Sequence, residues 1–92
     1  MILKKEITKE EDGSIGVIDV IYESSNILKT TYFPQKQLLY VYFNRGGTYS
    51  YAGVNQEVYE GLETSESQGK YFAQNIGKNK DTPNEKAVED YR

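Results

Sequence analysis

Four tyrosines and one arginine around a glycine turn are the residues of this chain best suited to ligand binding. Tyr40 and Tyr42 precede an Asn-Arg-Gly-Gly turn that contains Arg45, and Tyr49 and Tyr51 follow it. Phenol rings on adjacent strands stack on nucleobases, and a neighbouring cation binds phosphate. The same rings also suit an aromatic core beneath helices, so the sequence leaves open which tyrosines are exposed.

The segment 65–70, Ser-Glu-Ser-Gln-Gly-Lys, is a second candidate site. Ser67 is placed to cap a helix, Gly69 falls in the first turn of that helix, and Lys70 follows. The free N–H groups of a helix start, its dipole and an ammonium group together bind phosphate. The segment lacks the length of a P-loop, so nucleotide hydrolysis is not supported. Ordinary capping also explains Ser67.

A third candidate is Asn26, which ends a Ser-Ser-Asn turn. Its amide and the preceding hydroxyl groups could read a base or a ribose. A local hydrogen-bonded turn accounts for the same residues.

Catalysis has little support in this composition. The chain has no His and no Cys, which excludes Ser-His and Cys-His nucleophiles and classical zinc sites. Neighbouring carboxylates occur within charged runs such as 10–12, which are typical of a solvated loop. We therefore expect no catalytic residues, no metal site and no cofactor.

The charges are segregated along the chain, although the net charge is only −3. Residues 24–54 hold Lys29, Lys36 and Arg45 and no acid, whereas residues 55–67 hold four Glu and no base. This pattern predicts a local cationic surface if the tyrosine hairpin meets the segment around Lys70. The start of the chain is charged and no segment is apolar enough to span a membrane, which favours a soluble cytoplasmic protein.

The pattern of apolar and turn residues predicts an α+β fold, a small antiparallel β-meander of three to five strands packed against two short helices. Strands are expected over 2–8, 14–22, 27–33, 38–43 and 48–52. One helix follows a cap at Asn55, and a second spans 68–76 after Ser67. A third short helix is expected over 83–91 in the polar tail. The chain divides into an N-terminal β extension (1–23), a meander with two helices (24–76) and the polar tail (77–92).

The central part of the chain resembles the KTSC domain over about residues 24–76. The resemblance lies in a Tyr-x-Tyr motif followed by Gly-Val and in a late segment that reads Ser-x-Gly-x-Tyr-Phe, here Tyr49, Tyr51, Gly53, Val54, Ser67, Gly69, Tyr71 and Phe72. Family members usually carry Pro after the Gly-Val pair, where this chain has Asn55. The family occurs alone and at the C-terminus of some lysyl-tRNA synthetases, and this context implies RNA binding.

Together these observations predict a non-enzymatic module that binds RNA, single-stranded nucleic acid or a nucleotide. The residues predicted to bind the ligand are Tyr49, Tyr51, Arg45, Ser67, Gly69, Lys70 and Asn26. Two alternatives stay open: a phage or bacterial adaptor or inhibitor that binds a protein, and a sponge that sequesters a small signalling nucleotide. An open sheet edge allows either a monomer or a homodimer.

Overall fold

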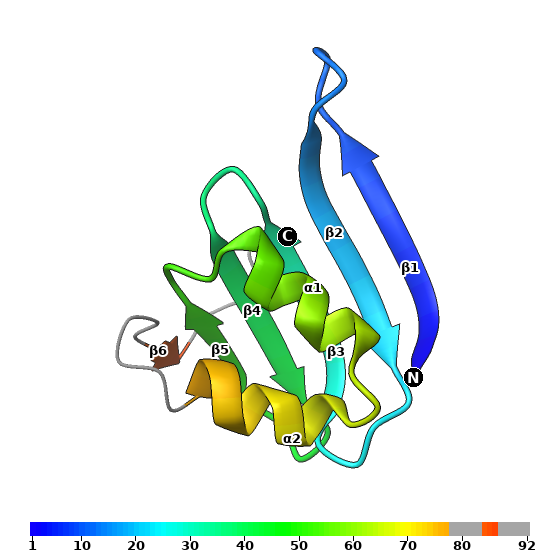
Figure 1. Cartoon of the computed structure of the whole chain (residues 1–92), viewed down its shortest axis with the longest axis vertical. Coiled ribbons are helices and arrows are strands. Elements are labelled where there is room, and N and C mark those ends of the chain that lie inside the picture. The colour runs from blue at the N-terminus through cyan, green and yellow to red at the C-terminus, as the bar shows by residue number, and fades with distance from the viewer. Residues whose placement is uncertain (78–83, 87–92) are drawn as a thin grey trace.

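Each strand of the sheet pairs with the strand that precedes it in the sequence. The computed structural model describes residues 1–77 and 84–86, and within them six antiparallel strands lie in the order β1-β2-β3-β4-β5-β6. Figure 1 shows this meander from the side that the helices cover. The strands are β1 (Ile2–Lys9), β2 (Ile15–Tyr22), β3 (Ile27–Phe33), β4 (Leu38–Phe43), β5 (Thr48–Tyr51) and β6 (Asn84–Lys86).

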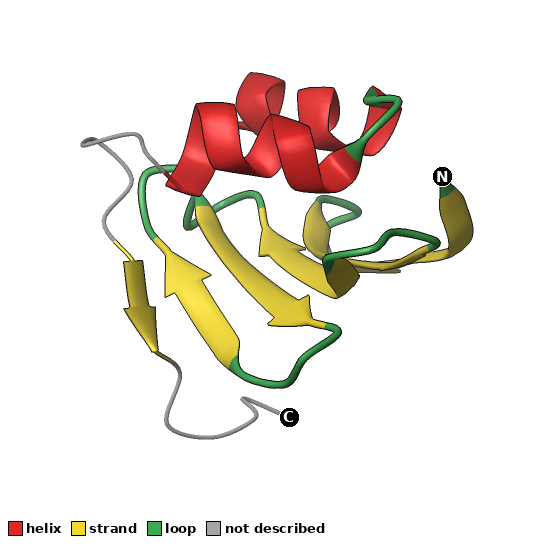
Figure 2. Cartoon of the chain, turned by 90° about the horizontal axis from the view of Figure 1, so that it is seen from below, coloured by secondary structure: helices red, strands yellow, loops and turns green. Residues whose placement is uncertain are grey.

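Two helices cover one face of the sheet, and no helix of the described residues lies on the other face (Figure 2). These are α1 (Gln56–Thr64) and α2 (Gln68–Phe72), and α2 continues as a π-helical turn, η1 (Ala73–Gly77). Asn55 caps α1, where its Oδ1 accepts a hydrogen bond from the N–H of Val58 at 2.9 Å. Ser67 caps α2 in the same way, since its Oγ accepts from the N–H of Lys70 at 3.4 Å. We call the two sides of the sheet the covered face and the open face.

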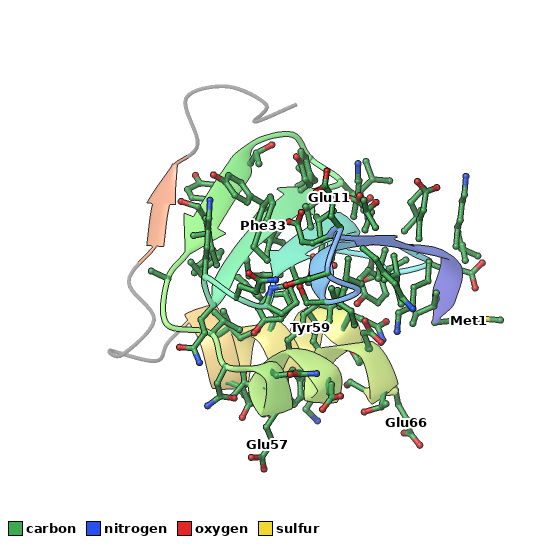
Figure 3. All side chains as sticks on the ribbon, turned by 90° about the horizontal axis from the view of Figure 1, so that it is seen from above. Met1, Glu11, Phe33, Glu57, Tyr59 and Glu66 are labelled. Atoms are coloured by element: carbon green, nitrogen blue, oxygen red, sulfur yellow. The ribbon has the colours of Figure 1, made fainter. Side chains whose placement is uncertain are left out.

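Alternation along the strands sends one set of side chains beneath the helices. Tyr32 of β3 stacks on Tyr59 of α1, with ring centroids 4.2 Å apart and planes 9° from parallel. Figure 3 shows Tyr59 between the sheet and the helices, with Glu57 and Glu66 on the outer side. The buried apolar core is Ile18, Val20, Tyr22, Ile27, Tyr32, Leu39, Val41, Tyr51, Val54, Tyr59, Leu62, Phe72 and Ile76.

The two helices approach each other closely at Gly61. The Tyr71 hydroxyl of α2 donates to the carbonyl of Val58 at 2.9 Å, and a Cβ at Gly61 would collide with that phenol. Gly61 therefore costs some helix propensity but leaves space for the ring that joins α1 to α2.

The β1–β2 hairpin forms one side of the sheet, and its tip projects beyond the rest of the molecule (Figure 1). Lys5 of β1 reaches α1, where its Nζ lies 2.8 Å from Oε1 of Glu63. In the part of the chain that the structure describes, β1 pairs only with β2, so its outer edge has no neighbouring strand.

The predicted α+β fold is confirmed: the meander and both helices are present. The helix predicted over 83–91 is wrong at Asn84–Lys86, because these residues pair with β5 as β6. The other residues of that range lie outside the described part of the chain. The local capping residues therefore predicted a helix, but pairing with the edge of β5 determines the structure of this segment.

Candidate functional site

Tyr49 and Tyr51, the two predicted stacking residues on β5, lie on the covered face. Tyr49 pairs with Val41 of the neighbouring strand β4, and Tyr51 pairs with Leu39 of the same strand. Tyr51 is only 4% exposed, and its ring centroid lies 5.1 Å from that of Phe72 in an edge-to-face contact. Tyr51, which we predicted to bind a ligand by stacking, is therefore not an exposed ring, because its register with Leu39 turns it toward the helices.

This burial makes the Tyr51 hydroxyl a weaker acid. Removal from water disfavours the phenolate, and together with the nearby Tyr49 hydroxyl this raises the pKa of Tyr51 to about 12. Tyr49 is half-buried and makes an edge contact with Phe43, at 5.8 Å between centroids. Both rings thus contribute to packing beneath α2.

Gly69 is explained by packing inside the chain. It is buried, and a Cβ at this position would lie 2.7 Å from the Nδ2 atom of Asn26. The side chain that approaches Gly69 closely is therefore that of Asn26, within the same chain. Ser67 and Lys70 line a hollow together with Glu66, which Figure 3 shows on the outer side of the helices.

Asn26 and Arg45 belong to two turns that are joined by hydrogen bonds. The N–H of Asn44 donates to the Asn26 carbonyl at 2.9 Å, and the Asn44 side chain donates to the Ser24 carbonyl at 2.6 Å. Ser24 Oγ in turn accepts from the N–H groups of Asn26 and Ile27, at 3.2 and 3.3 Å. The predicted convergence is therefore partial: Asn26 meets Gly69 and the turn of Arg45, but Tyr51 offers no exposed ring there.

The open face carries a different aromatic group, which we call the β3–β4 aromatic row: Phe33, Tyr40 and Tyr42. Phe33 and Tyr40 touch edge to face, with centroids 5.9 Å apart. Figure 3 shows Phe33 on the side of the sheet away from the helices. Tyr42 lies on the same face, because it alternates with the buried Val41.

Two lysines lie beside this aromatic row. Lys29 Nζ is 5.3 Å from the centroid of the Tyr42 ring, and Lys36 Nζ is 5.8 Å from the centroid of Phe33. Both distances are within the range of a cation–π interaction. The aromatic row therefore has one lysine at each end, Lys29 beside Tyr42 and Lys36 beside Phe33.

The charge of the open face changes between β3 and β2. Asp19 of β2 accepts a hydrogen bond from Thr31 at 2.6 Å, and its Oδ1 lies 3.9 Å from Nζ of Lys29. Beyond Asp19, a hollow of about 130 Å³ is lined by Lys4, Glu6, Asp19, Ile21 and Lys29. Residues 24–54 contain no acid, so β3, β4 and their turns bring only positive charges to the sheet, whereas β1 and β2 bring charges of both signs.

From the sequence all four tyrosines were candidates for ligand binding, but the residues finally predicted to bind included Tyr49 and Tyr51 and left out Tyr40 and Tyr42. The signal that separates the two pairs is the alternation in β4, where Leu39, Val41 and Phe43 form the more aliphatic face. Tyr40 and Tyr42 must then point away from the core.

Among the described residues no group of three or more His, Cys, Asp or Glu is placed to hold a metal ion. No helix in that part of the chain is long and apolar enough to cross a membrane.

The fold and its faces place the chain among small α+β domains in which two helices cover one side of an antiparallel meander. The KTSC domain family matches residues 23–79, and the chain belongs to this family. The crystal structure of a KTSC domain protein from Yersinia pestis is similar, with a TM-score of 0.68 and 28% identity. The similarity covers 77% of this chain and 97% of that one. No curated protein matches the chain.

Proposed function

We propose that this KTSC domain is a non-enzymatic module that binds single-stranded nucleic acid on the open face of its sheet. The observation that carries the proposal is the β3–β4 aromatic row, flanked by Lys29 and Lys36 in a stretch of sequence without acids, with Asp19 of the neighbouring strand β2 beside Lys29. Aromatic rings beside cations, on a sheet face that neither described helix covers, are the arrangement that single-stranded RNA and DNA bind through base stacking and phosphate contacts.

Each part of this surface has a distinct role in the proposal. The rings of Tyr40 and Tyr42 stack on bases, and every base offers a π face, so this contact tolerates many sequences. Lys29 and Lys36 lie over rings in the free protein. Their long side chains turn from the rings to phosphates when bases arrive, which exchanges a cation–π contact for an ion pair. Exposed Arg45, in the turn after β4, extends the cationic surface.

Binding of a fluorescein-labelled single-stranded RNA, measured by fluorescence anisotropy at low salt, tests the proposal. Tyr42→Leu removes the aromatic ring and is expected to weaken binding by about 1–3 kcal/mol, the range for stacking one base. Tyr42→Phe keeps the ring and is the matched control, so it should bind within about twofold of the unchanged protein. Circular dichroism of both variants establishes that they remain folded.

Three results would count against this function. The first is an absence of RNA or single-stranded DNA binding at low salt, and the second is equal binding by the Leu and Phe variants. The third is thermal stabilisation by cyclic nucleotides without binding of oligonucleotides, which would favour sequestration of a small nucleotide instead.

A further inference from the structure

The outer edge of β1 is the longer of the two strand edges at the ends of the described sheet. This strand has eight residues and pairs with β2 on one side, and among the described residues it has no neighbour on the other. An edge strand exposes N–H and C=O groups that another strand can bind. Leu3 is 59% exposed and Ile7 is 45% exposed on this strand, so it also presents apolar side chains to water.

We propose that the β1 edge pairs with the β1 edge of a second copy of this chain, antiparallel and centred on Lys5. In this register Lys4 lies opposite Glu6 of the second copy, and the two-fold axis repeats this pair, so two opposite-charge pairs form together. Leu3 is the extra residue where the β1–β2 register shifts between Ile2 and Lys4, so it forms no regular pair with Ile7 and adds only apolar surface near the ends of the paired segment. The result is one continuous sheet with the helices of both copies on the same side.

The positions of these side chains on β1 fit the register. Lys4 and Glu6 pair with Ile21 and Asp19 of β2 and line the hollow on the open face. Opposite residues of an antiparallel pair project from the same face, so Lys4 and Glu6 of two copies can meet there. The charged side chains of the two copies are thus complementary across the boundary between the two β1 strands, which we call the seam.

Lys5, which faces itself across the axis, is already neutralised within each copy. Its Nζ lies 2.8 Å from Oε1 of Glu63, on the covered face. The like charges at the centre of the seam therefore each carry their own counter-ion, which reduces their repulsion. This contact removes the main electrostatic objection to the register.

The two neighbouring registers place like charges opposite each other at the centre of the strand pair. A shift toward the N-terminus centres the seam on Lys4 and places Lys4 opposite Lys4. A shift toward the C-terminus centres it on Glu6 and places Glu6 opposite Glu6. Like charges that lie directly opposite destabilise a strand pair. Lysines on an edge strand ordinarily disfavour pairing with a second strand. Here they disfavour the neighbouring registers and leave the register that pairs Lys4 with Glu6.

Sedimentation velocity over a range of protein concentrations, at low salt, tests this pairing. The unchanged chain is expected to pass from monomer to dimer as its concentration rises. Lys4→Glu alone and Glu6→Lys alone each place like charges opposite one another twice, and each is expected to weaken dimerisation roughly tenfold or more. The double variant Lys4→Glu with Glu6→Lys restores opposite charges and should recover dimerisation.

A single-cysteine series reads the register directly, since the chain has no natural Cys. Lys5→Cys places the thiols opposite each other at the axis and should give a disulfide-linked dimer under mild oxidation, whereas Lys4→Cys and Glu6→Cys should not. If the chain stays monomeric at all concentrations, the proposal is wrong, and the β1 edge is then available to pair with a strand of another protein. A dimer that ignores both single charge changes, or that the double variant fails to restore, also overturns it.

Discussion

The two faces of the sheet use the same residue type for opposite purposes. On the covered face, tyrosines are packed beneath the helices: Tyr32 stacks on Tyr59, and Tyr51 contacts Phe72. On the open face, Tyr40 and Tyr42 lie beside Phe33 and two lysines. A phenol is large and apolar and carries one polar group, so it serves either environment. What distinguishes the two uses is the neighbouring residues, and not the tyrosines themselves.

The largest expected difference between the faces is in stability. Tyr59 is 1% exposed and its ring is stacked on Tyr32, so Tyr59→Ala should lower the free energy of unfolding by about 3–5 kcal/mol. Tyr40→Ala, the same change on the open face, should cost at most about 2 kcal/mol, because its ring is only half-buried. Urea denaturation measures both values, and equal losses would contradict the division of the two faces.

The next effect appears at alkaline pH. Burial is the main cause that raises the pKa of Tyr22, Tyr51 and Tyr59, and for Tyr51 the value rises from 10.0 to about 12. A raised pKa means that the unfolded chain loses its proton first. Stability from the neutral phenol is therefore complete below pH 10 and is lost as the pH rises toward 12.

Urea midpoints measured by circular dichroism from pH 8 to pH 12 check this prediction. Tyr51→Phe removes one of the titrating groups and should flatten the alkaline loss of stability. An identical loss in the variant and the unchanged chain would mean that Tyr51 ionises as easily in the folded state as in the unfolded state.

A smaller effect concerns Gly69. Because a Cβ here would lie 2.7 Å from the Asn26 amide, Gly69→Ala should destabilise the fold by about 1–3 kcal/mol. The cost should fall by at least about 1 kcal/mol in an Asn26→Ala background, where the obstructing amide is gone. A double-mutant cycle of unfolding free energies measures this coupling. If the cost is the same in both backgrounds, internal packing does not explain the glycine.

Much of the fold could be predicted from the sequence because its signals are local. Alternating apolar residues gave the strands, and Asn55 and Ser67 marked the helix starts that the structure confirms. The Gly-Gly turn after β4 is also present, with positive φ at Gly46 and Gly47. Strand β6 was missed because its pairing depends on a neighbouring strand far back in the sequence.

The candidate site was harder to predict, for a related reason. Alternation in β4 indicates that Leu39 and Val41 lie beneath the helices, but it does not state which side chains of β5 lie beside them. Tyr49 and Tyr51 could therefore not be assigned to the covered face until their register with Val41 and Leu39 was known. The reason for a glycine at position 69 likewise became clear only from its contact with Asn26, which no local sequence pattern reveals.

The most direct test of the open face as the binding face compares two exposed lysines on opposite sides of the sheet. Lys36 lies beside Phe33 on the open face, and Lys70 lies on the helices. For each variant the affinity for single-stranded RNA is measured across a salt series. Lys36→Gln should reduce the slope of log affinity against log salt by about 0.7, the value for one lost phosphate contact, and Lys70→Gln should leave it unchanged. A reduced slope for Lys70→Gln alone would contradict binding on the open face and would indicate that the binding site lies at the start of α2.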